Sequence, residues 1–449
     1  MQKILILGAG RSASSLIKYA IENASALQWE LSIGDYSLEL AQEKAKGHSH
    51  VRAFQFDVND EVQCEREVGN ADMVISMLPA RFHNLIAKHC VILKKNMVTA
   101  SYVSKEMQAM HDDAKSAGII LLNEVGVDPG IDHMSAKKVL DELARKGAKL
   151  NVFRSFTGGL IAPEYATNPW KYRFTWNPRN VILAGQGTAR FIEDNKLKYI
   201  PYKRVFKQFR NVHVDGVGDF DGYANRDSIQ YRTIYGLRNI PTMVRGTLRY
   251  PGYCEAWSVF VTLGLTDDSF QIKNSEHLTY AELVESFLPR VSSKDSLIVR
   301  LANLCGLDPN GESMRKVEWT GILSDEKIGL ANATPAQVLQ HLLMQKWTLQ
   351  PDDKDMIVMQ HEFIYELDNT IKQLNSALVV KGDDSTYTAM AKTVGYPVAI
   401  CAKLISQGKY NAKGVQIPLD AKLYNPVLDE LETLGIKFKE SIQSSEVFN

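Results

Sequence analysis

Short apolar runs alternate with longer amphipathic stretches from residue 2 to about residue 124. The runs have the length of β-strands, and several of the stretches between them repeat apolar positions at helical spacing, as at 14–24, 38–46, 82–93 and 105–117. Strands that alternate with crossover helices predict a parallel, doubly wound α/β sheet. The predicted strands are KILIL, WELSI, VRAFQF, MVISML, NMVTA and IILLN.

A different pattern follows Asp132 and predicts a second domain. We expect an amphipathic helix at 134–145, then the strand-like KLNVFRSF and aromatic-rich loops. Apolar helical segments between residues 278 and 346 predict a mostly helical subdomain, and MIVMQHEFIYEL and TIKQLNSALVV alternate as antiparallel partners do. A last long helix at 388–407 can pack back on the first domain.

The composition is that of a globular protein whose partner is a small molecule. A chain of 449 residues suggests two or three domains, and 45% hydrophobic with 23% charged residues excludes a disordered or fibrous class. Basic and acidic residues number 52 each without a basic run, so we expect no nucleic-acid partner. No apolar stretch approaches the roughly 20 residues of a membrane helix, and MQKILILGAG reaches glycine too early for a secretory signal. We therefore expect a cytoplasmic protein without membrane association.

Metal and disulfide chemistry are not expected. The five cysteines are odd in number, scattered and never in a CxxC pair, which argues against disulfides and a structural zinc site. HEFIY at His361 lacks the second histidine of the HExxH pattern, so a zinc protease site is not supported either.

The first strand leads directly into GAGRSA, where Gly8, Gly10 and Ala13 form a GxGxxA pattern. Gly8 can make the tight turn, Gly10 lets a pyrophosphate approach the backbone, and Ala13 permits close helix packing. A merely tight turn could carry the same pattern, but its place before repeated strand-helix units favours a Rossmann-type dinucleotide site. Arg11 and Ser12 complete this predicted phosphate-binding loop.

Two aspartates close the second and third predicted strands. Asp35 in LSIGDYS can hydrogen-bond both hydroxyls of an adenosine ribose and would repel a 2′-phosphate, which predicts NAD as the preferred cofactor and leaves NADP possible. The alternative is an aspartate that only forms a turn. Asp57, followed by Val58, can flank the adenine or form a turn equally well.

Three further motifs, SMLPARFH, TASYVS and NEVGVDPGID, end predicted strands. Ligands of open α/β sheets bind outside the carboxyl ends of the strands, so these motifs should lie together at one edge. We expect Ser101, Tyr102 and Asp128 at the site of hydride transfer, next to the nicotinamide. Asp132 is more often a helix cap than a catalyst, and His133 remains a candidate. The residues expected beside the nicotinamide are Ser76, Met77, Leu78 and Pro79.

Three arginines cluster in the second domain, in YANRDS and MVRGTLRY: Arg226, Arg245 and Arg249. A guanidinium group binds a carboxylate through two parallel hydrogen bonds, which suits a di- or tricarboxylate substrate. The alternative for each arginine is an ordinary surface charge.

Motifs along nearly the whole chain resemble, in order, segments of the glutamate-forming saccharopine dehydrogenases, also called saccharopine reductases. The motifs are GAG, VISMLPARFH, TASYVS, NEVGVDPGIDH, SFTGGLIAPE, NPWKYRFTW, NRDS, RGTLRYPG and AKTVGYPVAI. The resemblance implies a dinucleotide-binding domain at 1–127, completed by about 390–449. It also implies a mixed α/β substrate domain at 128–389, with a helical insertion at about 276–348.

The resemblance also implies site residues and an activity. Backbone at Val125, Gly126 and Val127 and the ring of Trp176 would border the nicotinamide. The activity would be the reversible, NAD(P)-dependent oxidation of saccharopine to glutamate and 2-aminoadipate 6-semialdehyde in lysine metabolism. The implied contacts with this dicarboxylate amino acid fall on Ser101, Tyr102, Asp128, Arg226, Thr247, Leu248 and Arg249, and Arg245 joins them from the arginine cluster.

Two departures from the fungal members of the family matter. Where they carry an arginine-containing stretch suited to NADP, this chain has Gly34, Asp35 and Tyr36. This difference again predicts NAD, and with it the degradative direction as a hypothesis. Where they carry a cysteine before two glycines of the substrate domain, this chain has Thr157, so a thiol cannot act there.

In this reaction a base must deprotonate the secondary amine before its lone pair helps to expel a hydride. Asp128 is the first candidate for that base, and Tyr102 or a bound water are the alternatives. A homodimer is the assembly we expect. The rival functions are a carboxynorspermidine dehydrogenase, whose polyamine substrate would need an acidic pocket, and a nucleotide-binding regulator without catalysis.

Overall fold

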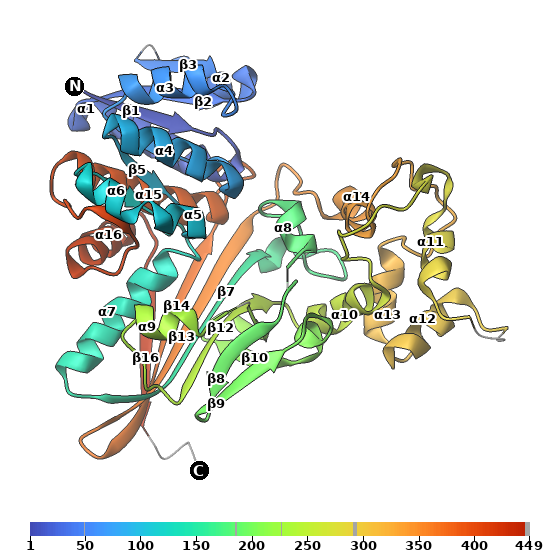
Figure 1. The fold of residues 1–449 in the computed structure, drawn as a ribbon. Helices are drawn as coiled ribbons and strands as arrows, with labels where there is room; N and C mark the ends of the chain where they lie inside the picture. The colour runs from blue at the N-terminus through green and yellow to red at the C-terminus, as the bar shows by residue number, and fades with distance from the viewer. Residues whose placement is uncertain (49, 185, 226, 291–293, 445–449) are drawn as a thin grey trace. The chain divides into compact units, whose positions relative to one another are not determined.

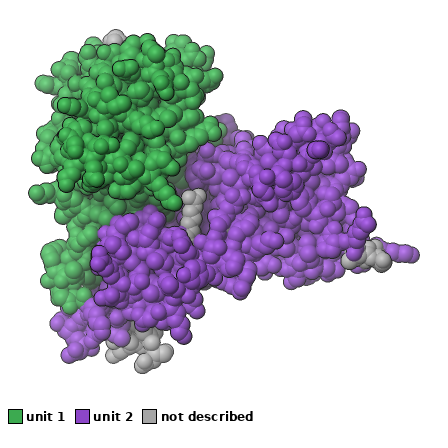
Figure 2. Space-filling view, in the orientation of Figure 1, with its two compact units in different colours: residues 1–148, 378–439 green, residues 149–377, 440–449 purple. Residues whose placement is uncertain are grey.

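The computed structural model describes residues 1–48, 50–184, 186–225, 227–290 and 294–444 (Figure 1). The chain forms two compact units (Figure 2). Unit 1 contains residues 1–148 and 378–439, and unit 2 contains residues 149–377 and the segment from residue 440. Among the described helices, none combines the length and the apolar character that crossing a bilayer requires.

Unit 1 is built on a parallel sheet with the strand order β15-β6-β5-β4-β1-β2-β3. Its β6-to-β3 portion has the Rossmann strand order, which reverses between β1 and β4. Sheets of this kind bind ligands at the carboxyl ends of their strands, at the point where the order reverses. The predicted doubly wound parallel sheet is confirmed. The strands are β1 (Gln2–Leu7), β2 (Trp29–Asp35), β3 (Val51–Gln55), β4 (Met73–Ser76), β5 (Asn96–Thr99), β6 (Ile120–Leu122) and β15 (Gly414–Gln416).

Helices lie on both faces of this sheet, with α1 against α15 and α3 against α4 (Figure 1). The helix expected at 105–117 is two helices, because the backbone of Met110 leaves the helical conformation at ψ 3°. The helices of unit 1 are α1 (Ser14–Leu27), α2 (Leu38–Ala45), α3 (Glu61–Asn70), α4 (His83–Leu93), α5 (Lys105–Ala109), α6 (His111–Ser116), α7 (Ile131–Arg145), α15 (Ala389–Ser406) and α16 (Ala421–Thr433), with 3-10 turns at Arg11–Ala13 and Ala80–Phe82.

The second sheet is mixed and has the order β10-β11-β12-β7-β13-β14-β16, with β8 on β12 and β9 on β8. Its centre pairs β12 with β7 in parallel, whereas β11 and β13 run antiparallel to these two strands. The strands are β7 (Lys149–Ile161), β8 (Ala189–Glu193), β9 (Lys196–Ile200), β10 (Phe209–Val214), β11 (Gly218–Ala224), β12 (Thr242–Arg249), β13 (Asp355–Leu367), β14 (Thr370–Lys381) and β16 (Phe438–Ser444).

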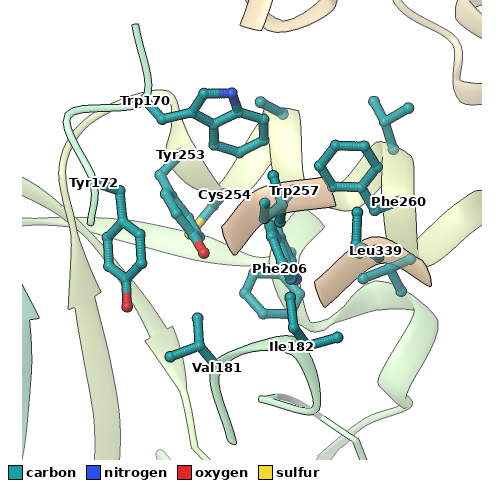
Figure 3. Packing of buried hydrophobic residues seen from close by; sticks show 14 of the residues in the cluster. Trp170, Tyr172, Val181, Ile182, Phe206, Tyr253, Cys254, Trp257, Phe260 and Leu339 are labelled. Atoms are coloured by element: carbon teal, nitrogen blue, oxygen red, sulfur yellow. The ribbon is translucent and has the colours of Figure 1, made fainter. Parts of the chain in front are cut away.

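The core of unit 2 is an aromatic cluster that joins the sheet to the helices (Figure 3). Trp170 stacks on Phe260 at 5.7 Å between ring centroids, and its indole N–H donates to the backbone oxygen of Lys316. The helices of unit 2 are α8 (Pro178–Ile182), α9 (Gln230–Ile234), α10 (Tyr253–Leu263), α11 (Tyr280–Phe287), α12 (Leu297–Cys305), α13 (Glu312–Trp319) and α14 (Pro335–Trp347), with 3-10 turns at Pro163–Tyr165, Tyr202–Lys207 and Ser275–His277.

Candidate active site

The glycine loop after β1 has the geometry of a phosphate-binding turn. Gly8 adopts φ +99°, and a Cβ there would lie 2.7 Å from the backbone oxygen of Met77, which directly follows β4, so no larger residue fits. A Cβ on Gly10 would meet no heavy atom within 4 Å, so the backbone there is open to a ligand. Arg11 is exposed and Ser12 half-buried, whereas Ala13 is buried. The loop therefore fits the pyrophosphate of a dinucleotide.

The aspartate at the end of β2 is tied to this loop. Asp35 Oδ2 accepts the backbone N–H of Ala9 at 2.7 Å, and Oδ1 accepts the N–H of Ser37 at 2.9 Å. Asp57 forms a local turn, because its Oδ1 accepts the backbone N–H of Asn59, and Val58 beside it is buried. Each of these carboxylates thus has a structural role in the loop where it lies.

The loops after β5 and β6 bring Tyr102 and Asp128 together, as hydrogen-bonded partners. The Tyr102 hydroxyl donates to Asp128 Oδ1 at 3.0 Å, and the Tyr102 ring is 41% exposed. The backbone from Val125 to Val127 is buried between these two residues in sequence. A carboxylate that accepts a phenol hydrogen bond can hold or accept a proton at a reacting amine.

A buried hydrogen-bond network stabilises the two loops that carry Tyr102 and Asp128. Glu124 Oε1 accepts the N–H of Val103 at 3.0 Å, and its Oε2 lies 2.9 Å from His133 Nε2. His133 Nδ1 lies 3.7 Å from Asp132 Oδ2, while Asp132 Oδ1 accepts the N–H of Gly130 at 2.6 Å. Val103 follows Tyr102 and Gly130 lies two residues after Asp128, so the network fixes both loops. Sequence reasoning treated Asp132 and His133 separately and missed Glu124.

A second histidine, His83 at the start of α4, lies between the ends of two strands. Its Nδ1 is 2.8 Å from Ser76 Oγ, and its Nε2 is 2.7 Å from Ser101 Oγ. Burial lowers the pKa of His83 to about 4, so the ring is neutral at pH 7. The sequence predicted no role for His83, although this residue lies within the SMLPARFH motif. The feature that could have identified His83 is its position at the start of α4, the helix that follows β4 and the SMLPARFH motif.

The remaining predicted residues of this edge line the same strand ends. Ser76 is fully buried at the end of β4, Met77 and Leu78 are half-buried, and Pro79 is exposed. The N–H of Met77 donates to the backbone oxygen of Leu7 at 2.7 Å, which holds this segment beside the glycine loop.

In unit 2, alternation along β12 places Arg245, Thr247 and Arg249 on one face, while Leu248 packs into the aromatic core. Arg245 stacks on Tyr231, with its guanidinium carbon 4.1 Å from the ring centroid. Trp176 packs half-buried against the same core. Arg226 lies outside the described residues.

Arg249 is a buried charge without a carboxylate partner among the described residues. Its guanidinium carbon lies 5.3 to 5.9 Å from the rings of Tyr172, Tyr223 and Tyr253, and its Nη1 donates to the backbone oxygen of Leu248. Its Nε has no hydrogen-bond partner there, and neither has the Tyr172 hydroxyl. A buried guanidinium stays protonated and is costly to bury unpaired, so this group favours an anionic ligand.

Thr157 extends this polar patch. It pairs with Thr247 across β7 and β12, and its buried hydroxyl has no partner in the described part of the chain. Across the described ranges we find no group of three histidine, cysteine, aspartate or glutamate side chains arranged to hold a metal ion.

Unit 1 thus belongs, by strand order and glycine loop, to the class of Rossmann-type dinucleotide-binding proteins. Comparison with known proteins makes this class more specific. The model of the saccharopine dehydrogenase NADP binding domain matches residues 4–122, and that of the saccharopine dehydrogenase C-terminal domain matches residues 126–436. The chain belongs to the saccharopine dehydrogenase family, as its motifs predicted.

Individual relatives agree with this assignment. The saccharopine dehydrogenase (NADP+, L-glutamate-forming) of Saccharomyces cerevisiae is 32% identical over 448 residues, which cover 98% of this chain and 99% of the yeast protein. The mitochondrial alpha-aminoadipic semialdehyde synthase of Bos taurus is also 32% identical over 97% of this chain, but the chain spans only 47% of that protein's length.

Solved structures agree as well. An apo, histidine-tagged saccharopine dehydrogenase (L-Glu forming) from Saccharomyces cerevisiae superimposes with a TM-score of 0.89 at 31% identity, covering 99% of this chain and 100% of the yeast chain. A homospermidine synthase from Legionella pneumophila in complex with NAD has a TM-score of 0.58 at 11% identity, over 98% of this chain and 91% of that one, and shares the fold.

Proposed function

We propose that the protein catalyses the reversible, NAD(P)-dependent oxidation of saccharopine to glutamate and 2-aminoadipate 6-semialdehyde, a step of lysine metabolism. The observation that carries this proposal is the end-to-end similarity to the glutamate-forming yeast enzyme, which covers 98% of this chain and 99% of the relative. The Tyr102–Asp128 pair and the buried Arg249 supply the two chemical functions that such a reaction needs, a proton acceptor and a carboxylate partner.

Arg249 is the group that we propose binds a substrate carboxylate. Its unpartnered Nε and the nearby Tyr172 hydroxyl are donors that a carboxylate can satisfy, and the three surrounding tyrosine rings exclude water. Burial raises the pKa of Tyr172, so its hydroxyl stays a donor at physiological pH. The full set of proposed substrate contacts is Ser101, Tyr102, Asp128, Arg226, Arg245, Thr247, Leu248 and Arg249.

Asp128 is the residue that we propose accepts the proton of the secondary ammonium of saccharopine. Once that nitrogen is neutral, its lone pair can assist departure of the hydride from the adjoining carbon on the lysine side. The Tyr102 hydroxyl, which donates to Asp128 Oδ1, holds the carboxylate in place and is the alternative proton carrier. Water then adds to the imine carbon, and cleavage of the carbon–nitrogen bond releases glutamate with its amine and leaves the aldehyde.

The nicotinamide cofactor supplies the hydride acceptor when it is bound. We propose that Gly8, Gly10, Arg11, Ser12 and Ala13 bind its pyrophosphate, and that NAD is preferred because Asp35 would repel a 2′-phosphate. The matching family model and the fungal relatives carry NADP in their names, so this preference needs a direct test. The other proposed cofactor contacts are Asp57, Val58, Ser76, Met77, Leu78, Pro79, Val125, Gly126, Val127 and Trp176.

The decisive experiment follows nicotinamide absorbance with saccharopine and NAD or NADP and quantifies the glutamate released. We expect glutamate in proportion to the reduced cofactor. Asp128→Asn, which keeps an acceptor for the Tyr102 hydroxyl, should lower kcat by about 10²-fold or more because the base is lost. Asp60→Asn, at the N-cap of α3 and outside the proposed contacts, is the matched control for kcat, because asparagine caps a helix as well as aspartate.

Two results would contradict the proposal. Absence of turnover with both cofactors would redirect attention to polyamine condensation and then to a regulator without catalysis. Unchanged kcat in Asp128→Asn would remove Asp128 from the chemistry. A polyamine is disfavoured physically, because a cationic substrate would gain nothing from the unpaired Arg249 guanidinium.

We extend the proposal to a cytoplasmic homodimer. All five cysteines are buried free thiols, as expected in a reducing compartment. Cell fractionation tests the location, and light scattering of the eluted protein tests the assembly.

A further inference from the structure

His83 connects two serines that come from neighbouring strands of unit 1. Ser76 ends β4 and Ser101 follows β5, and these strands pair in parallel, with Ser76 opposite Thr99. The imidazole lies 2.8 Å from the Ser76 hydroxyl through Nδ1 and 2.7 Å from the Ser101 hydroxyl through Nε2. Thr99 Oγ1 lies farther away, at 3.4 to 3.5 Å from the two ring nitrogens.

The imidazole must be neutral in this setting. His83 is 3% exposed, the side chains that contact its nitrogens are hydroxyls, and burial lowers its pKa to about 4. A neutral imidazole has one N–H donor and one acceptor nitrogen. The hydrogen bonds to Ser76 and Ser101 therefore run in one direction: if Ser76 donates to Nδ1, then Nε2–H donates to Ser101.

This direction decides what Ser101 can offer a ligand. When Ser101 Oγ accepts from Nε2–H, its own hydrogen is free to donate to an anion. The backbone of Ser101 is held, since its oxygen accepts the N–H of Glu124 at 3.0 Å, and the side chain is half-buried. The remaining freedom of Ser101 is its side-chain rotamer and the direction of its O–H, and His83 restricts both.

We propose that His83 is a positioning residue that, through the chain Ser76–His83–Ser101, orients the Ser101 hydroxyl as a donor to a carboxylate of the substrate. The inference rests on the proposed function, because saccharopine supplies the carboxylate. An anion at the Ser101 end of this hydrogen-bond chain favours the Nε2–H tautomer of His83, because successive donors that point toward the anion polarise one another. His83 acts only through Ser101 and takes no part in the proton transfer at Asp128.

A double-mutant cycle tests this role. His83→Asn can keep a contact with Ser76, but its side chain is too short to reach Ser101. We therefore expect the KM for saccharopine to rise about 10-fold, which corresponds to the loss of roughly one well-oriented hydrogen bond to a charged group. We expect kcat to change less than about 3-fold, because the bond is equally present before and during hydride transfer. In a Ser101→Ala background, His83→Asn should have no further effect on KM.

Three matched variants sharpen the cycle. His83→Gln has a longer side chain that reaches Ser101, so it should restore most of the KM. His361→Asn removes another buried histidine, which hydrogen-bonds Ser155 at 3.0 Å in unit 2, and should leave the KM unchanged. Should His83→Asn fail to fold, Ser76→Ala perturbs the same chain and should raise the KM only while Ser101 is present.

The tautomer provides a readout independent of turnover. We expect ¹⁵N NMR of the wild-type protein with saccharopine to show His83 protonated at Nε2 and unprotonated at Nδ1. Protonation at Nδ1, or an equal effect of His83→Asn on KM with and without the Ser101 hydroxyl, would overturn the inference. Absence of saccharopine turnover in the wild-type protein would instead overturn the proposed function on which it rests.

Discussion

Asp35 has a structural role, and it is also the residue that we propose selects the cofactor. Its two oxygens accept the N–H groups of Ala9 and Ser37, so it stabilises the glycine loop whatever cofactor is bound. We propose that the negative charge at this point also disfavours the 2′-phosphate of NADP. The sequence predicted the second effect from position alone, but the first effect depends on how β1 and β2 pair.

Replacing Asp35 by Asn separates these two effects. The amide keeps one acceptor oxygen, for one of the two backbone N–H groups, and removes the charge. We therefore expect the ratio of kcat/KM with NADP to kcat/KM with NAD to rise about 10-fold or more. Steady-state kinetics with both cofactors measures the ratio, and Asp60→Asn at the N-cap of α3 is the control. An unchanged ratio, or wild-type turnover that already favours NADP, would show that Asp35 does not select the cofactor.

Some side chains of the candidate site can be identified from local sequence motifs, whereas others can be identified only from the folded structure. Gly8, Tyr102 and Asp128 lie in local motifs, so the sequence indicates them without knowledge of the fold. Glu124, His83 and Tyr172 have no local signature, because their roles arise from partners on other strands, helices or loops. His83 lies 7 residues from Ser76 and 18 from Ser101, and Glu124 lies 21 residues from Val103.

Among the elements, α15 shows how a helix late in the chain becomes part of the first unit. It spans Ala389–Ser406 and packs against α1, where Gly395 faces the backbone of Leu16. A Cβ on Gly395 would lie 2.6 Å from the Leu16 nitrogen, so close contact between these helices requires glycine at this point. The sequence predicted this helix, but it did not predict the neighbouring β15, whose three residues are too few to show a periodic pattern.

Gly395→Ala should therefore destabilise unit 1. Alanine favours an open helical position by roughly 1 kcal/mol over glycine, but overpacking against Leu16 should cost roughly 1–3 kcal/mol and dominate. Urea unfolding measures the change. Gly69→Ala in α3 is the matched control, because its Cβ would meet only Leu93 Cδ1 at 3.9 Å. Equal or greater stability of Gly395→Ala than of Gly69→Ala would contradict the packing argument.

The molecule as a whole consists of two compact units with separate cores, so one free energy of unfolding does not describe it. Its tryptophans offer a way to follow each unit. Trp29 lies in unit 1, whereas Trp170, Trp176, Trp257, Trp319 and Trp347 lie in unit 2. Labelling with 5-fluorotryptophan lets ¹⁹F NMR resolve the two groups during urea unfolding.

Acidification should weaken unit 1 through His83. The pKa is about 4 in the folded state and about 6.5 in the unfolded state, so the unfolded chain binds the extra proton. The contribution of His83 to the free energy of unfolding is fully present above pH 6.5 and declines as the pH falls toward 4. The loss is roughly 2 kcal/mol between pH 7 and pH 5. The Trp29 signal should show that loss in the wild-type protein and less of it in His83→Asn. The same pH dependence in both proteins would refute this origin.

The sequence by itself determined the alternation of strands and helices in unit 1, the glycine loop, the family and the Tyr102 and Asp128 motifs. These features depend on periodic burial and on backbone conformations that a few neighbouring residues dictate. Three features depend on the tertiary structure alone: the hydrogen bonds of His83 with two serine hydroxyls, the hydrogen bond from Val103 to Glu124, and the tyrosine rings around Arg249. The physical reason is that hydrogen bonding and burial of charge depend on partners that chain folding brings together from distant segments.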